Sequence, residues 1–143
     1  TARIMPLKAF DADGRSNTFD LLRAIYFAAD RRVQIVNMSF SMKQSSPELE
    51  RAIRYATDRR VALVSAAGND GNEIDVYPAS LAEVIGVAST SIDDRRSDFS
   101  NYGSPLVSLA APGQGLVAAY PGGNYATVWG TSFSAPLVTG APA

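Results

Sequence analysis

The sequence predicts an α/β fold in which a doubly wound parallel sheet is flanked by helices. The main signal is an internal repeat, because the pattern that runs from Arg23 to Val33 returns from Arg51 to Val61. In each copy an amphipathic helix leads into a short strand. Both strands, residues 33–37 and 61–65, are apolar runs, as expected for parallel strands that are covered on two faces. Helices that alternate with such strands favour a parallel sheet.

Composition narrows the class of protein further. The chain has 143 residues, enough for one domain or part of one, and residues 1–143 are treated as a single unit. Its 46% hydrophobic and 19% charged residues are ordinary for a globular protein. The net charge of −1 argues against a nucleic-acid surface. No apolar run approaches the roughly 20 residues that span a bilayer, so no membrane partner is expected.

Two residue types are missing from the sequence. Without cysteine, disulfides, thiol catalysis and cysteine-based zinc sites are excluded. Without histidine, the chain cannot supply the usual general base at neutral pH. No cluster of metal ligands stands out, so neither a metal site nor another cofactor is expected.

The first half of the chain is expected to hold a strand, a turn and the two helices of the repeat. Residues 4–10 are predicted to form a short buried strand, and residues 11–14 a solvated turn rather than a carboxylate site. The segment Ser45-Ser46-Pro47-Glu48 is predicted to begin the second helix, with a serine cap, an early proline and glutamate in the first turn. The buried helix faces are expected to be Leu21, Ala24, Ile25 and Ala28 in the first helix, and Leu49, Ala52, Ile53 and Ala56 in the second.

A pair of arginines follows each helix of the repeat, Arg31-Arg32 and Arg59-Arg60. Because cations suit the negative end of the helix dipole, both pairs are expected at helix C-termini. A processing site or a surface for an acidic partner is the functional alternative.

The second half of the chain is richer in turn signals. Residues 84–88 predict a third buried strand, and residues 93–97 a charged turn. Turns at 100–103 and 111–113 are expected to separate short β-segments. A further turn at Gly122-Gly123 precedes the last predicted helix.

Two loops are the expected places for a ligand. In a doubly wound sheet, ligands bind beyond the carboxyl ends of the strands. The loops at those ends are residues 37–41 and 65–71.

The segment Gly130-Thr131-Ser132-Phe133-Ser134-Ala135-Pro136 is predicted to be a tight turn that begins a helix, with Ser132 at the helix N-terminus. Backbone N–H groups there favour an anion, such as an alkoxide or the oxyanion of a tetrahedral intermediate. An ordinary helix cap is the alternative for Ser132, and an ordinary Asn-Asp-Gly turn is the alternative for Asn69.

This segment resembles the nucleophile motif of the subtilisin-like serine proteases (the subtilase family, peptidase S8). Residues 66–71, Ala-Ala-Gly-Asn-Asp-Gly, resemble the oxyanion-hole segment of the same family. Four more segments resemble the family and follow its order, at residues 36–39, 77–79, 99–103 and 109–113. The resemblance covers essentially the whole chain and implies the C-terminal portion of a subtilisin-like catalytic domain.

The resemblance implies a role for each matching residue. Ser132 would be the nucleophile, and Asn69 would donate to the oxyanion together with the Ser132 backbone N–H. The walls of the pocket for the substrate residue before the scissile bond would be Ser39, Phe40 and Ser41 on one side, and Ala66, Ala67 and Gly68 on the other. The family often has glycine where Ser41 stands, so a side chain there would narrow the groove.

The family's Asp-Thr-Gly and His-Gly-Thr-His motifs, which carry the rest of its triad, are not in the sequence. The chain alone is therefore expected to be inactive. Lys8 and Lys43 are the candidates for a base within the chain. The related sedolisins pair serine with glutamate, but Asn69 favours the subtilisin side. A non-catalytic fragment or pseudoenzyme, and an α/β domain in which Ser132 and Asn69 are only caps and turns, are the rival hypotheses.

Partners and location follow from the resemblance alone. The substrate would be a peptide or protein, and the setting extracellular, either secreted or at the cell surface. Weak calcium binding is known in the family. The chain is expected to be part of something longer, because it begins without Met and ends at residues 140–143, where the family's helix would run on. An N-terminal companion segment, or a second copy of the chain, would cover the surfaces left exposed.

Overall fold

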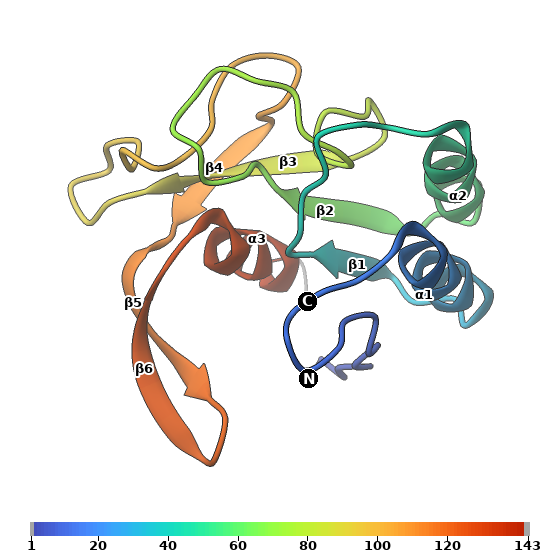
Figure 1. Ribbon diagram of the computed structural model, residues 1–143, viewed down its shortest axis with the longest axis horizontal. Helices are drawn as coiled ribbons and strands as arrows, with labels where there is room; N and C mark the ends of the chain where they lie inside the picture. Colours follow the sequence, from blue (N-terminus) through green and yellow to red (C-terminus); the bar gives the residue numbers. More distant parts are fainter. Residues whose placement is uncertain (1, 142–143) are drawn as a thin grey trace.

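The computed structural model describes residues 2–141 and shows a parallel sheet with helices on both faces (Figure 1). The sheet has four parallel strands in the order β1-β2-β3-β4, and two further strands pair as an antiparallel hairpin. The elements in chain order are α1 (Thr18–Asp30), β1 (Ile35–Met38), α2 (Pro47–Asp58), β2 (Ala62–Ala66), β3 (Ile85–Thr90), β4 (Leu109–Pro112), β5 (Gln114–Tyr120), β6 (Asn124–Trp129) and α3 (Thr131–Gly140). The predicted α/β class, with a parallel sheet and flanking helices, is confirmed.

Successive residues of β2 show how the two helical layers are divided. Leu63 packs in the core with α1 and α2, whereas Val64, the next residue, packs with Ala135 of α3. Because side chains of a strand alternate between the faces of its sheet, α1 and α2 cover one face and α3 covers the other. The sheet is therefore doubly wound.

The starts of α1 and α2 are capped by side chains. The side-chain oxygen of Asn17 accepts from the N–H of Asp20 at 3.0 Å, and Ser46 accepts from the N–H of Leu49 at 3.1 Å. The predicted start of α2 at residues 45–48 is confirmed, and the structure identifies Ser46 as the capping serine. Hydrogen bonding to backbone at this helix start and the nearby Arg51 guanidinium lower the pKa of Glu48.

The buried faces of the two helices agree closely with the prediction. The α2 face is as predicted, whereas in α1 Ala29 is buried and Ala24 is only half-buried. Both arginine pairs follow the helices, as predicted, with Arg32 and Arg60 in the left-handed region at φ 54° and 63°. The guanidinium groups of Arg31 and Arg59 lie over the rings of Phe27 and Tyr55, at 4.7 and 3.4 Å from the ring centroids.

The strands of the repeat are shifted slightly from their predicted positions. β1 begins at Ile35 rather than residue 33, and β2 runs from Ala62 to Ala66. The strands were expected to be buried along their length. This is confirmed for β2 after its first residue and for the centre of β3, the third predicted strand. It is wrong for β1, in which Ile35 and Val36 are half-buried because β1 lies at the edge of the described sheet.

The prediction of a buried strand at residues 4–10 is wrong. The segment is irregular, and Ile4 is 92% exposed. A strand needs a neighbour to satisfy its backbone groups, and no strand in residues 2–141 pairs with this segment. The solvated turn that follows is confirmed, since Asp11 Oδ1 accepts from the N–H groups of Asp13 and Arg15 at 3.0 and 2.8 Å.

Of the predicted turns in the second half, that at Gly122-Gly123 is present, whereas residues 100–103 are irregular. The turn predicted at 111–113 is wrong, because Ala111 and Pro112 belong to strand β4. The charged turn at 93–97 is confirmed, and β4 joins the parallel sheet beside β3. β5 and β6 form a hairpin around Gly122 and Gly123 that projects away from the sheet (Figure 1). The hairpin exposes large apolar side chains, with Val117 at 73% and Tyr125 at 77%.

Within the described residues, no helix combines the length and the apolar character that a membrane crossing needs. α3 ends at Gly140, and the rest of the predicted end at 140–143 falls partly on residues 142–143, which lie outside the described part of the chain.

Candidate active site

The candidate site lies where the carboxyl ends of β1 and β2 meet the N-terminus of α3. β1 and β2 are parallel neighbours, with Met38 opposite Ser65, so the loops that follow them leave the sheet at the same edge. α3 packs against the sheet and contacts every strand from β1 to β4. The two loops predicted to hold a ligand are thus brought together with Ser132.

Ser132 occupies the first turn of α3 rather than its cap. The cap is Gly130, which has φ 142° and no side-chain capping bond. This backbone conformation is strained for any residue with a side chain, which accounts for glycine at that position. The Ser132 hydroxyl is half-buried and donates to the carbonyl oxygen of Ser39 at 3.3 Å. It is therefore not the helix cap of the alternative interpretation.

A second hydrogen bond joins Ser39 and Ser132 in the opposite direction. The Ser39 hydroxyl donates to the carbonyl oxygen of Ser132 at 2.8 Å, and it accepts from Asn37 Nδ2 at 2.9 Å. The end of β1 and the start of α3 are therefore joined by a reciprocal pair of bonds across residues far apart in the sequence.

The side chain of Asn69 is oriented by the same helix start. Its Oδ1 accepts from the backbone N–H of Thr131 at 2.9 Å and from the Thr131 hydroxyl at 3.0 Å. The Thr131 hydroxyl in turn accepts from the buried N–H of Gly68 at 3.1 Å. Within residues 2–141 no hydrogen bond is recorded for Asn69 Nδ2, so its two N–H groups remain available to an acceptor.

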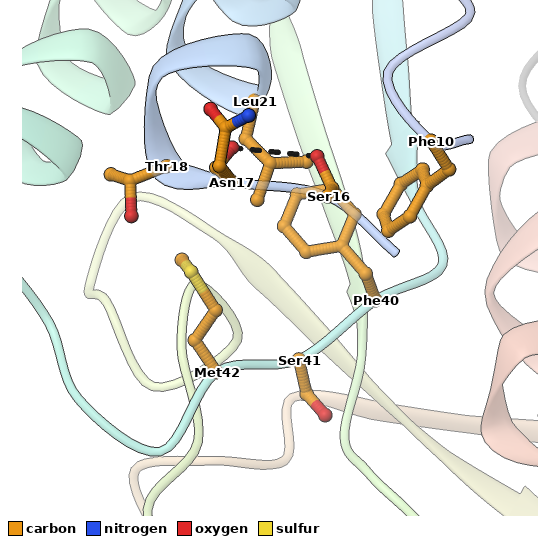
Figure 2. A pocket seen from close by; sticks show the side chains of 8 residues that line it. All are labelled: Phe10, Ser16, Asn17, Thr18, Leu21, Phe40, Ser41 and Met42. Carbon is orange, nitrogen blue, oxygen red and sulfur yellow. Dashed lines mark hydrogen bonds between the residues drawn. The ribbon is translucent and has the colours of Figure 1, made fainter. Parts of the chain in front are cut away.

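The predicted pocket walls differ in how they are placed. Phe40 and Ser41 line a hollow of about 290 Å³, shown in Figure 2, while Ser39 lies beside Ser132. The ring of Phe10 lies 5.8 Å from that of Phe40, centroid to centroid. The remaining lining residues are Ser16, Asn17, Thr18, Leu21 and Met42.

The residues expected to form the opposite wall are buried. Ala66 packs with the α3 residue Ala135, and Ala67 packs with Val76 and Leu106. Gly68 is buried as well, and none of the three lines the hollow. Their contact with substrate stays a prediction.

In the described part of the chain, the recorded hydrogen-bond partner of the Ser132 hydroxyl is a backbone carbonyl. Lys8 and Lys43 are exposed, and neither is bonded to Ser132. Residues 2–141 contain no group of three histidine, cysteine, aspartate or glutamate side chains that could hold a metal ion.

Three further side chains support the site and have no predicted role: Asn37, which donates to Ser39; Thr131, which binds Asn69; and Asn101, which binds the backbone of the Asn69 loop. Thr131 stands inside the quoted motif, and its place before Ser132 was the available signal. Asn37 lies in the loop 37–41 that was predicted to hold a ligand, and Asn101 lies in the turn predicted at 100–103, but nothing in their spacing predicts the contacts they make.

A match to a protein-family model shows the family to which the chain belongs. The model Peptidase_S8, described as the subtilase family, matches residues 1–143. The chain belongs to the subtilase family. The subtilisin-like resemblance is thereby confirmed.

Individual subtilases show the same similarity over part of their length. The chain is 36% identical over 139 residues to thermitase from Thermoactinomyces vulgaris, covering 97% of this chain and 50% of thermitase. It is 35% identical over 143 residues to subtilisin BL from Lederbergia lenta, covering 100% and 53%. It is 35% identical over 145 residues to the intracellular serine protease of Paenibacillus polymyxa, covering 98% and 44%. The chain thus spans about half the length of these curated subtilases.

Two solved protease structures match the fold, and the chain again covers about half of each. The prenylagaramide maturation protease PagA superposes with a TM-score of 0.85 at 34% identity, covering 91% of this chain and 49% of PagA. A cold-adapted subtilisin-like serine proteinase superposes with a TM-score of 0.86 at 32% identity, covering 92% and 49%.

Proposed function

We propose that residues 1–143 are the nucleophile-bearing part of a serine endopeptidase domain, and that the complete protein hydrolyses peptide bonds by acyl transfer. Ser132 Oγ would attack the substrate carbonyl carbon as a base takes its proton. The oxyanion formed would accept hydrogen bonds from Asn69 Nδ2 and the Ser132 N–H. Collapse of the intermediate breaks the C–N bond, and the base returns the proton to the leaving amine. Water then repeats the sequence and frees the acid.

The observation that carries this proposal is the orientation of the Asn69 amide. Thr131 holds its Oδ1 end from two donors, at 2.9 and 3.0 Å, and Thr131 immediately precedes Ser132. The Nδ2 end is left to an incoming acceptor at the N-terminus of α3, where the helix dipole also favours negative charge. An anion formed on a substrate bonded to Ser132 would find both donors in one place.

The base would come from the remainder of the domain. The Ser132 hydroxyl donates to the Ser39 carbonyl, and a carbonyl oxygen is too weak a base to remove its proton. Since the sequence has no histidine, the resemblance assigns this role to a histidine in the half of the domain that relatives have and this chain does not match. We therefore propose that the chain alone is inactive.

The substrate would be a peptide or protein bound along the loop after β1. The hollow lined by Phe10, Leu21, Phe40 and Met42 suits an apolar side chain of that substrate. Protein groups and water fill every role in the reaction, so no cofactor is proposed.

The remainder of the domain is also the proposed partner of the exposed apolar surface. The hairpin residues Val117 and Tyr125 and the free edge of β1 would be covered by it, with a second copy of the chain as the alternative partner. An extracellular setting is proposed from the resemblance. One relative is named as intracellular, so fractionation of the source cells is the direct test.

Labelling with a fluorophosphonate probe, followed by mass spectrometry, tests the proposal. The chain is labelled alone and after mixing with the remaining half of the domain. Ser132→Ala and Ser134→Ala serve as a matched pair, because Ser134 is a buried serine of the same helix. We expect labelling of the assembled protein at Ser132, its loss in Ser132→Ala and its retention in Ser134→Ala.

Two outcomes contradict the proposal. An assembled mixture that is not labelled would remove the catalytic role and favour a protein that acts only by binding. Labelling of the chain alone would show a base within it, and Lys8 and Lys43 would be replaced next.

A further inference from the structure

Asn101 is a fully buried polar side chain with no part in the proposed chemistry so far. It lies in the segment between β3 and β4 and is 0% exposed. Its Oδ1 accepts from the backbone N–H groups of Asp70 and Asn72, at 2.9 and 3.3 Å. The side-chain Nδ2 of Asn101 donates to the carbonyl oxygen of Ala67 at 3.0 Å. The backbone N–H of Asn101 donates to the carbonyl oxygen of Gly68, also at 3.0 Å. One residue therefore holds the backbone of the loop after β2.

These four bonds bracket Asn69. Two of the bonded residues precede it and two follow it in the loop. In the described chain, the recorded hydrogen bonds of the Asn69 side chain go to Thr131 alone. The place of Asn69 Nδ2 thus depends on two anchors: Thr131 orients the amide, and Asn101 holds the backbone that carries it.

An asparagine side chain fits this position because it must accept and donate at once. Aspartate would keep the acceptor but would set a second oxygen against the Ala67 carbonyl, near the Asp70 carboxylate that now lies 3.4 Å from Asn101 Nδ2. The loop also lies directly on the amide. A Cβ at Gly68 would come within 2.5 Å of Asn101 Nδ2, so this close approach of the loop requires glycine at position 68.

We propose that Asn101 is a positioning residue for oxyanion stabilisation, which acts by holding the loop so that Asn69 Nδ2 reaches the oxyanion. The inference rests on the proposed function, in which Asn69 is the donor. Because the oxyanion forms only after attack, misplacing its donor lowers kcat more than it changes KM. A displacement of about 1 Å can cost about 10²-fold in rate.

The test is a double-mutant cycle in the complete protease that contains this chain. Asn101→Asp, Asn69→Ala and their combination are compared for kcat and KM on one peptide substrate. Asn72→Asp is the matched control, since it makes the same change on the same loop at an exposed side chain. We expect Asn101→Asp to lower kcat by about 10- to 100-fold with little change in KM. In the Asn69→Ala background the same change should lower kcat less than about threefold, and Asn72→Asp should leave kcat unchanged.

The outcomes separate this inference from the proposed function. Suppose that Asn69→Ala lowers kcat. If Asn101→Asp then lowers kcat by the same factor with and without Asn69, or if it raises only KM, the positioning role is wrong and the proposed function stands. If Ser132→Ala leaves activity unchanged, or Asn69→Ala leaves kcat unchanged, the proposed chemistry fails and the inference fails with it. Should Asn101→Asp not fold, Asn101→Ser, which keeps one donor and acceptor, enters the same cycle with the same two outcomes.

Discussion

Replacing Thr131 by valine should both destabilise the protein and loosen the candidate oxyanion donor. Valine has nearly the same shape as threonine, so the change removes a hydroxyl from a fully buried site without opening a cavity. The hydroxyl accepts from the buried N–H of Gly68 at 3.1 Å and donates to Asn69 Oδ1 at 3.0 Å. An unpaired buried donor costs about 1–3 kcal/mol, while Asn69 is exposed enough for water to replace much of its lost bond. The expected loss is therefore about 2 kcal/mol, set mainly by the Gly68 N–H.

Urea denaturation measures this loss. With a slope of about 2 kcal/mol/M, a loss of this size lowers the midpoint by about 1 M. Thr131→Ser is the control, because it keeps the hydroxyl and removes one methyl group, at a cost of about 1 kcal/mol. Fluorophosphonate labelling of the assembled protein should also be slower in Thr131→Val than in Thr131→Ser. A Thr131→Val protein as stable as Thr131→Ser, and labelled as fast, would refute the reasoning.

Three other replacements test the packing around the site and the helices. Gly113→Ala should cost about 1–3 kcal/mol in thermal unfolding, because its methyl group would overlap the Ser134 hydroxyl, whereas Gly140→Ala, in open space on α3, should not destabilise. Ser46→Ala should cost about 1 kcal/mol by loss of the α2 cap, and Ser46→Asp should restore it; equal unfolding temperatures for the two would contradict the capping role. The bond from Tyr55 to Asp30 raises the pKa of Tyr55, so its stabilising effect is present below pH 10 and lost as pH rises through the raised value. Above pH 10 the stability of the wild type should fall more steeply than that of Tyr55→Phe, and parallel curves would exclude this linkage.

Much of the fold could be predicted because local signals and tertiary packing agree. The Ser46 cap, the spacing of apolar residues in α2 and the apolar run that forms β2 all indicate the same helix–strand unit. The failures occur where a segment depends on a distant neighbour. Residues 4–10 have the composition of a strand but no strand beside them, and the β5–β6 pairing could not be inferred from its turn alone.

In the candidate site, too, some features could be predicted from the sequence and others depend on contacts between distant residues. The meeting of the two loops follows from the rule that parallel strands end at one edge, so the sequence predicts it. The place of Ser132 beside them was implied by the resemblance alone. The bonds from Thr131 and Asn101 to the Asn69 loop join residues more than thirty positions apart, at |i−j| of 62 and 31. No periodicity or motif encodes such a pair. The hollow beside Phe40 was missed likewise, because Phe10 reaches it from a segment expected to be a strand.

The order of the strands has a consequence for how this protein folds. β1, β2, β3 and β4 lie side by side in the order in which they are synthesised, so each new strand finds its neighbour already made. α3 follows all four strands in the chain and contacts each of them, and the bonds between Ser39 and Ser132 close a loop across residues far apart in the sequence. Closing so long a loop costs entropy that is recovered only when the final contacts form. The four described strands can therefore pair before Ser132 reaches its place at the end of β1, because α3 follows them in the chain.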